Sequence, residues 1–134
     1  MTATPFLERW FEIMDSDEPE RVLDLITDDF VMSVQFSKGG GQAAEFVGDR
    51  AGLEVYLDQR ERSVLIHHVT EGARVGDVEL VLGRTTRDGE FEASFNASAL
   101  IDDATDKCRR LLIGRTPEVE FPRTDGPPGG QRAV

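Results

Sequence analysis

Residues 64–116 read VLIHHVTEGARVGDVELVLGRTTRDGEFEASFNASALIDDATDKCRRLLIGRT, and this stretch decides the fold. Its strand-like segments are separated by Gly76-Asp77, by Asp88-Gly89 and by the acidic loop 103–106. Asp-Gly is the strongest hairpin signal in the sequence, because a type I′ turn needs positive φ at both central residues. The stretch predicts a meander of four antiparallel strands over residues 64–75, 78–87, 90–102 and 107–116.

Three helices are predicted before the meander. Thr4-Pro5 is a start signal for the first, which spans about residues 4–15, because the Thr4 hydroxyl can cap a free backbone N–H and proline presets φ at the first position. The acidic segment 15–20 ends that helix and begins a second, short one, and Asp49 can cap a third that runs to about residue 62. The expected buried faces are Phe6, Leu7, Trp10, Ile13 and Met14, then Val22, Leu23 and Ile26, then Leu53, Tyr56 and Leu57.

A hairpin is expected between the second and third helices. From Phe30 the apolar period changes to two, so that Phe30, Met32, Val34 and Phe36 share one strand face. The run Gly39-Gly40-Gly41 makes a flexible turn, and residues 43–47 can return as a short strand. Helices followed by a run of antiparallel strands indicate an α+β fold with one core.

The chain is expected to form one domain with a tail. A length of 134 residues suits a single domain, which we place at residues 1–116. Residues 117–134 are rich in Pro and Gly, so we expect no helix or strand there.

Composition excludes several classes of function. The formal net charge of −11 would repel a nucleic-acid backbone, and basic residues do not cluster. No apolar run approaches the ~20 residues of a membrane span, and no secretory signal begins the chain, so a cytoplasmic location is expected. The single Cys108 cannot form an internal disulfide, and a buried, inert thiol is the expectation.

The order of elements resembles the nuclear transport factor two superfamily, and its SnoaL-like branch in particular. The resemblance is carried by FLERWFEIMDSDEPERVLDLITDDFVMSV at residues 6–34 and by IHHVT at residues 66–70, and it covers residues 4–116. It implies a strongly curved, mostly antiparallel sheet that wraps around three helices as a cone with an apolar cavity. Members include isomerases, dehydratases, cyclases and hydrolases, so the fold does not define the chemistry.

The known active sites of that superfamily match this sequence only in part. Where ketosteroid isomerases carry their catalytic carboxyl groups, alignment on Asp28-Asp29 gives Val34 or Ser33, and a later strand gives Ala97. Scytalone dehydratases carry a pocket histidine, and His67 stands at the comparable position. The resemblance therefore implies a histidine site rather than a pair of acids.

His67 is the predicted catalytic residue. His67 and His68 are consecutive in a strand, so only one of them can face the interior. We favour the face of Leu65, His67 and Val69, because the resemblance places the pocket histidine there. An imidazole titrates near neutral pH and can relay a proton. The alternative is a structural histidine that is hydrogen-bonded in a wall or interface.

Three further residues are predicted to contact a ligand: Trp10, Tyr56 and Arg84. Trp10 lies on the inner stripe of the first helix and Tyr56 on that of the third; the alternatives are plain core packing for Trp10 and a solvent-exposed rim position for Tyr56. Arg84 shares a strand face with Leu80 and Leu82, so it needs either a ligand anion or a salt bridge within the chain. Asp28-Asp29 is expected to face solvent, and Arg60 to complement a helix end.

Two functions stay open on this evidence. One is a small-molecule binding protein with an apolar pocket. The other is a cofactor-independent isomerase, dehydratase, cyclase or hydrolase that acts on a small hydrophobic, polyketide- or steroid-like substrate. No metal and no covalent cofactor are expected, because adjacent histidines in a strand cannot converge on one ion. A homodimer is expected from the resemblance and from strands that are apolar on both faces.

Overall fold

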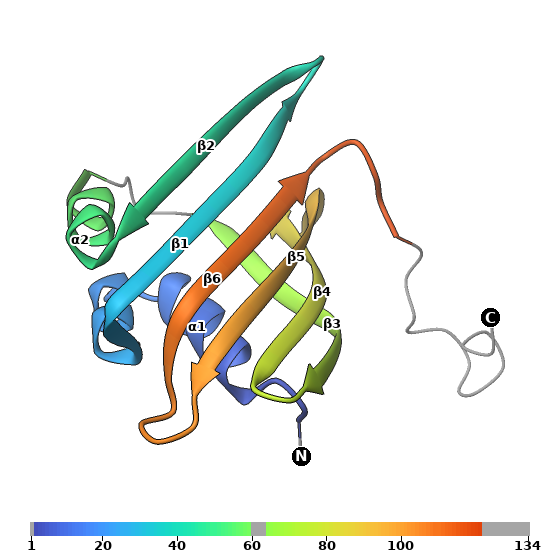
Figure 1. The fold of residues 1–134 in the computed structure, drawn as a ribbon. Coiled ribbons are helices and arrows are strands. Elements are labelled where there is room, and N and C mark those ends of the chain that lie inside the picture. The colour runs from blue at the N-terminus through green and yellow to red at the C-terminus, as the bar shows by residue number, and fades with distance from the viewer. Residues whose placement is uncertain (1, 60–63, 122–134) are drawn as a thin grey trace, which may run out of the picture.

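The protein is described by a computed structural model that covers residues 2–59 and 64–121. The elements follow in the order expected from the sequence (Figure 1). They are α1 Pro5–Met14, the 3-10 helix η1 Pro19–Leu25, β1 Ile26–Gly39, β2 Gln42–Asp49, α2 Arg50–Gln59, β3 Leu65–Val75, β4 Val78–Arg87, β5 Glu90–Asp102 and β6 Lys107–Thr116.

All six strands belong to one mixed, mostly antiparallel and curved sheet. The strand order is β2-β1-β6-β5-β4-β3, and every neighbouring pair is antiparallel except β1 and β6, which run parallel. The helices lie on one side of the sheet, with α1 behind it in the view of Figure 1. The α+β fold class and the four-stranded meander are therefore confirmed.

The predicted turns have the predicted backbone geometry. Asp88 and Gly89 have φ angles of 53° and 82°, which are the two positive values that a type I′ turn requires. The φ angles of Gly39, Gly40 and Gly41 are 88°, 62° and 80°, so this run closes the β1–β2 hairpin in conformations that only glycine adopts easily. Local sequence thus determines where these strands end.

Two boundaries near the second helix differ from the prediction. The strand β1 begins at Ile26 instead of Phe30, and η1 ends before Ile26, so Asp28 and Asp29 lie within the strand. The cause is non-local, because Ile26 pairs with Cys108 of β6 and a register shift follows before Val31.

At the third helix, Asp49 accepts the N–H of Gly52 at 3.0 Å, which confirms the cap. The end predicted near residue 62, and Arg60, lie outside the described residues.

The N-terminus of α1 is capped differently from the expectation. Thr4 makes no side-chain cap, and its hydroxyl donates instead to Glu8 at 2.9 Å. The buried carboxylate of Glu79, on β4, accepts the N–H groups of Phe6 and Leu7 at 3.1 and 2.9 Å. A negative charge at this helix end interacts favourably with the helix dipole. Glu79 therefore ties α1 to the sheet from a position 72 residues along the chain from Leu7.

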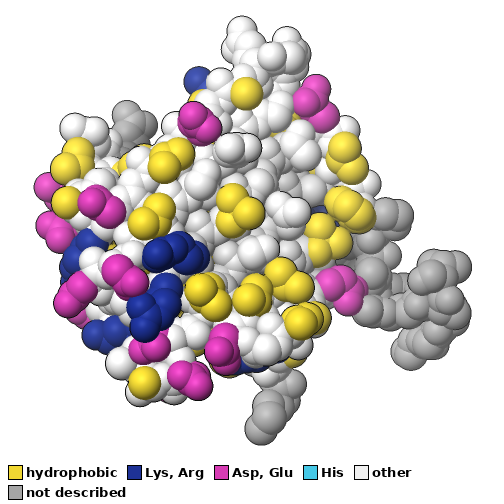
Figure 2. Space-filling view, viewed as in Figure 1, with side chains coloured by type: hydrophobic (Ala, Val, Ile, Leu, Met, Phe, Trp, Pro, Cys, Tyr) yellow, Lys and Arg dark blue, Asp and Glu magenta, His cyan; other side chains and the backbone are white. Residues whose placement is uncertain are grey.

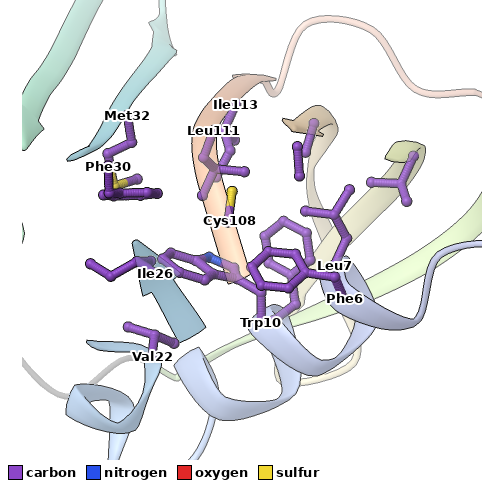
Figure 3. Packing of buried hydrophobic residues seen from close by; sticks show 14 of the residues in the cluster. Phe6, Leu7, Trp10, Val22, Ile26, Phe30, Met32, Cys108, Leu111 and Ile113 are labelled. Atoms are coloured by element: carbon purple, nitrogen blue, oxygen red, sulfur yellow. The ribbon is translucent and has the colours of Figure 1, made fainter. Parts of the chain in front are cut away.

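The core lies between the helices and one face of the sheet. The inner strand positions alternate with exposed ones, so Phe30 and Met32 are buried while Val31 is 41% exposed. Leu7 and Trp10 of α1 pack against this face (Figure 3). The other buried apolar members are Phe6, Phe11, Ile13, Val22, Ile26, Leu53, Val81, Phe95, Ala97, Ala99, Ile101, Cys108, Leu111 and Ile113.

The opposite, outer face of the sheet is partly apolar and open. Its exposed members include Val47 on β2 at 61%, Leu112 on β6 at 56% and Ile66 on β3 at 45% exposure. Figure 2 shows hydrophobic side chains spread over the sheet face turned to the viewer, with charged side chains toward its margins. This face is where the predicted homodimer contact would form.

Residues 117–121 form no helix or strand, but they contact the domain. The Ser37 hydroxyl donates to Glu118 at 2.9 Å, and Arg84 pairs with Glu120 at 2.8 Å. The start of the predicted tail is therefore held by two polar contacts, whereas the rest of it, residues 122–134, lies outside the described residues.

Candidate functional site

The most distinctive polar contact in the described chain joins His67 to Asp15. Nδ1 of the His67 ring lies 2.7 Å from Oδ1 of Asp15, and the backbone N–H of His67 donates to Oδ2 at 2.7 Å. The His67 side chain is 16% exposed and the Asp15 side chain 10%. One carboxylate thus holds both the backbone and the ring of His67.

The local structure explains why these two residues meet. Asp15 is the C-cap of α1, where its own N–H bonds the carbonyl of Phe11. His67 lies on β3, which is an edge strand, so an N–H on its outer side has no neighbouring strand to bond. The Asp15 carboxylate takes that position, and the end of α1 is thereby fixed to the sheet edge.

Aromatic rings enclose the imidazole. The Phe11 ring stacks on the His67 ring with centroids 4.7 Å apart, and the Phe95 ring meets it edge-on at 5.2 Å. Phe11 and Phe95 also contact each other edge-to-face at 4.8 Å. These contacts restrict the ring to one orientation and exclude water from two of its sides.

Gly83 makes this arrangement possible. A Cβ atom at position 83 would lie 2.4 Å from Cζ of Phe95 and 2.5 Å from the carbonyl oxygen of His68. Both distances are too short for any side chain. The absence of a side chain on this residue of β4 gives the Phe95 ring its place beside His67.

The hydrogen bond to Asp15 defines what the ring can do. An ionised carboxylate can only accept, so Nδ1 must carry the proton and Nε2 of the neutral ring is left as a free acceptor. No residue within 2–59 or 64–121 forms a hydrogen bond with Nε2. The site therefore presents an oriented base whose acquired positive charge would be balanced by Asp15 and by the C-terminal end of α1.

His68 has the opposite orientation, as expected for adjacent strand residues. It is exposed, and its Nε2 lies 2.9 Å from the Thr86 hydroxyl. Leu65, His67 and Val69 are each less exposed than their even-numbered neighbours. The predicted inward face of β3 is confirmed.

Trp10 and Tyr56 are not brought to His67. Trp10 is 1% exposed and lies between Phe6 and Phe30, with ring centroids 6.1 and 6.2 Å away. Figure 3 shows its indole within the apolar core. Tyr56 is 37% exposed and packs on Phe46 at 4.8 Å. The surroundings of Trp10 are those of a packing residue, and a ligand contact for either side chain stays a prediction.

Arg84 lies on the outer face of the sheet. Its strand partner is His68, and the inward positions of β4 are instead Glu79, Val81, Gly83 and Thr85. The Arg84 guanidinium pairs with Glu120 and lies 5.0 Å from the centre of the Phe91 ring. The expected salt bridge within the chain is confirmed, and the structure does not bring Arg84 to His67.

A different arginine lies on the inner face. Arg115 is the strand partner of both Phe95 and Phe36, and it pairs with Glu92. Its guanidinium carbon is 6.0 Å from the centre of the Phe36 ring. Arg115 was not among the predicted site residues, because it stands at the end of a strand, next to the Pro/Gly-rich tail.

A hollow of about 630 Å³ opens near the β1–β2 hairpin. Five of its lining residues, Gln35, Ser37, Ala43, Glu45 and Gly114, occupy outer-face positions, and Phe36 and Ala44 complete it. None of these residues takes part in the contacts of the His67 ring. The hollow is therefore separate from the Asp15–His67 pair.

The remaining candidate groups show no catalytic arrangement. Asp29 is exposed and pairs with Arg109 at 3.0 Å, and the Thr27 hydroxyl and Arg109 lower its pKa. Cys108 is fully buried, and burial raises the pKa of its thiol to about 12. No group of three or more His, Cys, Asp or Glu that could hold a metal occurs within residues 2–59 and 64–121. No helix in the same ranges is long and apolar enough to cross a membrane.

Asp15 is the residue that the sequence analysis missed. It was assigned only to the acidic break after the first helix. One signal was available, since Asp15 follows the inward-facing Phe11 by four residues and so lies on the same side of the helix. What could not be foreseen is that the edge of β3 passes this helix end.

Comparison with known proteins defines the fold. No protein-family model and no curated protein matches this sequence. Among solved structures, a candidate ketosteroid isomerase from Kribbella flavida has a TM-score of 0.60 at 16% identity, covering 96% of this chain and 84% of that one. A candidate isomerase of the SnoaL-like family from Agrobacterium tumefaciens has a TM-score of 0.60 at 9% identity, covering 86% and 98%.

A candidate polyketide cyclase from Sinorhizobium meliloti is also similar, with a TM-score of 0.57 at 16% identity over 80% of this chain and 91% of that one. Identities this low establish the fold alone. The chain has the cone-like α+β fold of the SnoaL-like and nuclear transport factor two-like proteins, which confirms the resemblance at that level.

Proposed function

We propose that this protein is a cofactor-independent enzyme that moves a proton on a small hydrophobic substrate. The observation that supports it is the pair Asp15–His67, in which Oδ1 of the carboxylate lies 2.7 Å from Nδ1 of the imidazole and Oδ2 accepts the backbone N–H of His67 at 2.7 Å. A base in an orientation fixed by a carboxylate is the arrangement that general base catalysis needs. His67 is the proposed base, and Asp15 the residue that positions it.

The proposed reaction begins at a carbon next to a carbonyl group. Nε2 of His67 takes the proton, the C–H electron pair forms a carbon–carbon double bond, and the carbonyl π electrons move to oxygen to give an enolate. If the substrate carries a β,γ double bond, the carbonyl re-forms, the double bond moves to the α,β position, and the imidazolium returns the proton to the γ carbon. If the substrate carries a β-hydroxyl group, the carbonyl re-forms, the C–O bond breaks, and the imidazolium protonates the departing oxygen to give water. The first outcome is an isomerisation and the second a dehydration, so no external oxidant or reductant is consumed.

The second candidate is a binding protein for an apolar small molecule. The aromatic surroundings of His67 favour it, because Phe11 and Phe95 leave the ring few open sides. A binding protein would not need an oriented base, however, and the two hydrogen bonds to Asp15 supply one. We therefore place the enzyme first. An apolar pocket beside His67, a homodimer and a cytoplasmic location belong to either proposal.

Solvent deuterium exchange tests the choice. The ketone 2-tetralone has an exchangeable C–H next to its carbonyl, so NMR can follow loss of that proton in D₂O. We expect the wild type to accelerate exchange over buffer, His67→Ala to lose about 100-fold or more of the acceleration, and His68→Ala to retain it. Equal rates for wild type and His67→Ala would refute the catalytic role. Bound ketone without any acceleration would favour the binding protein.

A further inference from the structure

Arg115 lies on the same face of the sheet as His67. Directly paired strand residues point to the same side, and Arg115 is paired with Phe95 on β5 and with Phe36 on β1. Phe95 is buried on the helix side of the sheet, where its ring contacts His67. Phe95 therefore stands between His67 and Arg115.

The guanidinium of Arg115 is only partly satisfied. It pairs with Glu92, and its side chain is 25% exposed. Its Nε is buried, and no hydrogen-bond partner for it exists among residues 2–59 and 64–121. A guanidinium carries five N–H donors, and a buried donor without a partner is unfavourable. Few native groups remain in that state, so an absent acceptor is indicated.

The charge around Arg115 favours a neutral acceptor. The Glu92 carboxylate already balances the guanidinium, and the chain carries a net charge of −11. A second carboxylate beside Glu92 would be repelled, whereas a carbonyl oxygen accepts a hydrogen bond without adding charge. The ring of Phe36, over which the guanidinium lies, supplies an apolar surface for the rest of such a molecule.

We propose that Arg115 is a specificity-determining residue that binds a carbonyl oxygen of the substrate, while the apolar part of the molecule lies against Phe36, which is only partly buried. This inference rests on the proposed function for the location of the site. It goes beyond it by naming the residue that binds the carbonyl oxygen and by predicting that a neutral carbonyl compound binds more tightly than a hydrocarbon or a carboxylic acid. Arg115 would then act from β6 and His67 from β3.

Equilibrium binding of three matched probes tests the proposal: 2-tetralone, the hydrocarbon tetralin, and tetralin-2-carboxylate. Isothermal titration calorimetry should show that the wild type binds the ketone about tenfold more tightly than either of the others. Arg115→Met removes the donors but keeps an apolar stem, so it should abolish the preference for the ketone. Arg115→Lys provides a second variant that retains the charge but lacks Nε, and it should weaken the preference.

Arg84→Met is the matched control. Arg84 also pairs with a glutamate and lies over a phenylalanine, but on the outer face. This variant should keep the preference for the ketone. A wild type that binds all three probes alike, a tighter carboxylate, or an Arg115→Met variant that retains the preference would each overturn the proposal.

The same titrations on His67→Ala separate this inference from the proposed function. The variant should bind the ketone with its preference intact even though it no longer accelerates exchange. Loss of preference in Arg115→Met together with unchanged exchange in His67→Ala would uphold the binding role and refute the catalytic one. The reverse pattern would uphold catalysis by His67 and refute the role of Arg115.

Discussion

Asp15 accepts two hydrogen bonds from His67, one from the backbone N–H and one from Nδ1 of the ring, each 2.7 Å long. The first bond fixes the end of α1 to the edge of β3, and the second fixes the ring. A single carboxylate thus couples the packing of the fold to the orientation of the proposed base. The predictions below follow from this coupling and from the contacts around it.

Asp15→Asn should slow deuterium exchange into 2-tetralone by about 100-fold. The asparagine oxygen can still accept the backbone N–H, so the fold should persist, but an amide no longer balances the charge of a protonated ring. NMR of the exchange reaction measures the rate. Asp24→Asn, at an exposed carboxylate on η1, is the control and should react like the wild type. An Asp15→Asn rate equal to that of the wild type would argue against the pair.

Gly83→Ala should destabilise the protein by about 1–3 kcal/mol, as expected for overpacking. The new methyl group would overlap the Phe95 ring and the carbonyl of His68. Gly52→Ala is the control, since its Cβ would meet its nearest neighbour at 3.7 Å in α2, and it should be neutral or stabilising. Urea unfolding gives both free energies. Two equal effects would show that the space at Gly83 is not needed.

The buried thiol of Cys108 should make stability depend on alkaline pH. Burial raises its pKa from 9.0 to about 12 in the folded chain. The unfolded chain therefore loses this proton first, and the contribution to stability is complete below pH 9 and is lost as the pH rises toward 12. Between pH of about 8 and about 10.5, the loss in unfolding free energy should be on the order of 2 kcal/mol greater in the wild type than in Cys108→Ala. Equal losses would contradict the assignment.

Leu112→Asp should convert a dimer to a monomer. Leu112 is 56% exposed on the central strand β6, in the apolar outer face where we expect a second copy to bind. Light scattering should give twice 14.9 kDa for the wild type and 14.9 kDa for the variant. Val55→Asp, at a side chain that is 55% exposed on α2, should remain dimeric. A wild-type mass of 14.9 kDa would contradict the predicted homodimer.

The fold could be predicted well where local sequence determines it. The three later strands, 78–87, 90–102 and 107–116, have the predicted bounds, because alternation and glycine turns are properties of adjacent residues. The start of β1 was wrong, since pairing with β6 extends that strand to Ile26. The cap on α1 was wrong for the same reason, because Glu79 arrives from a distant strand.

Of the residues in the candidate site, the sequence indicated only His67. Adjacent histidines in a strand must diverge, and the resemblance placed His67 rather than His68 on the inner face. Its catalytic role stays a prediction. Asp15 and Arg115 depend on which elements pass each other in space, so the sequence alone did not indicate their roles. Arg84 was predicted because it stands among apolar residues, and that face of β4 is the outer one.

The most direct test of the central claim is the protonation of the His67 ring, measured by ¹⁵N NMR at a pH of about 8, where a neutral imidazole is expected for an ordinary histidine. The Asp15 hydrogen bond predicts a proton on Nδ1 and a free lone pair on Nε2, with the exposed His68 as an internal reference. Loss of that tautomer in Asp15→Asn would show that the Asp15 carboxylate fixes the proton on Nδ1. A His67 ring that carries its proton on Nε2 would contradict the assignment of this residue as the base.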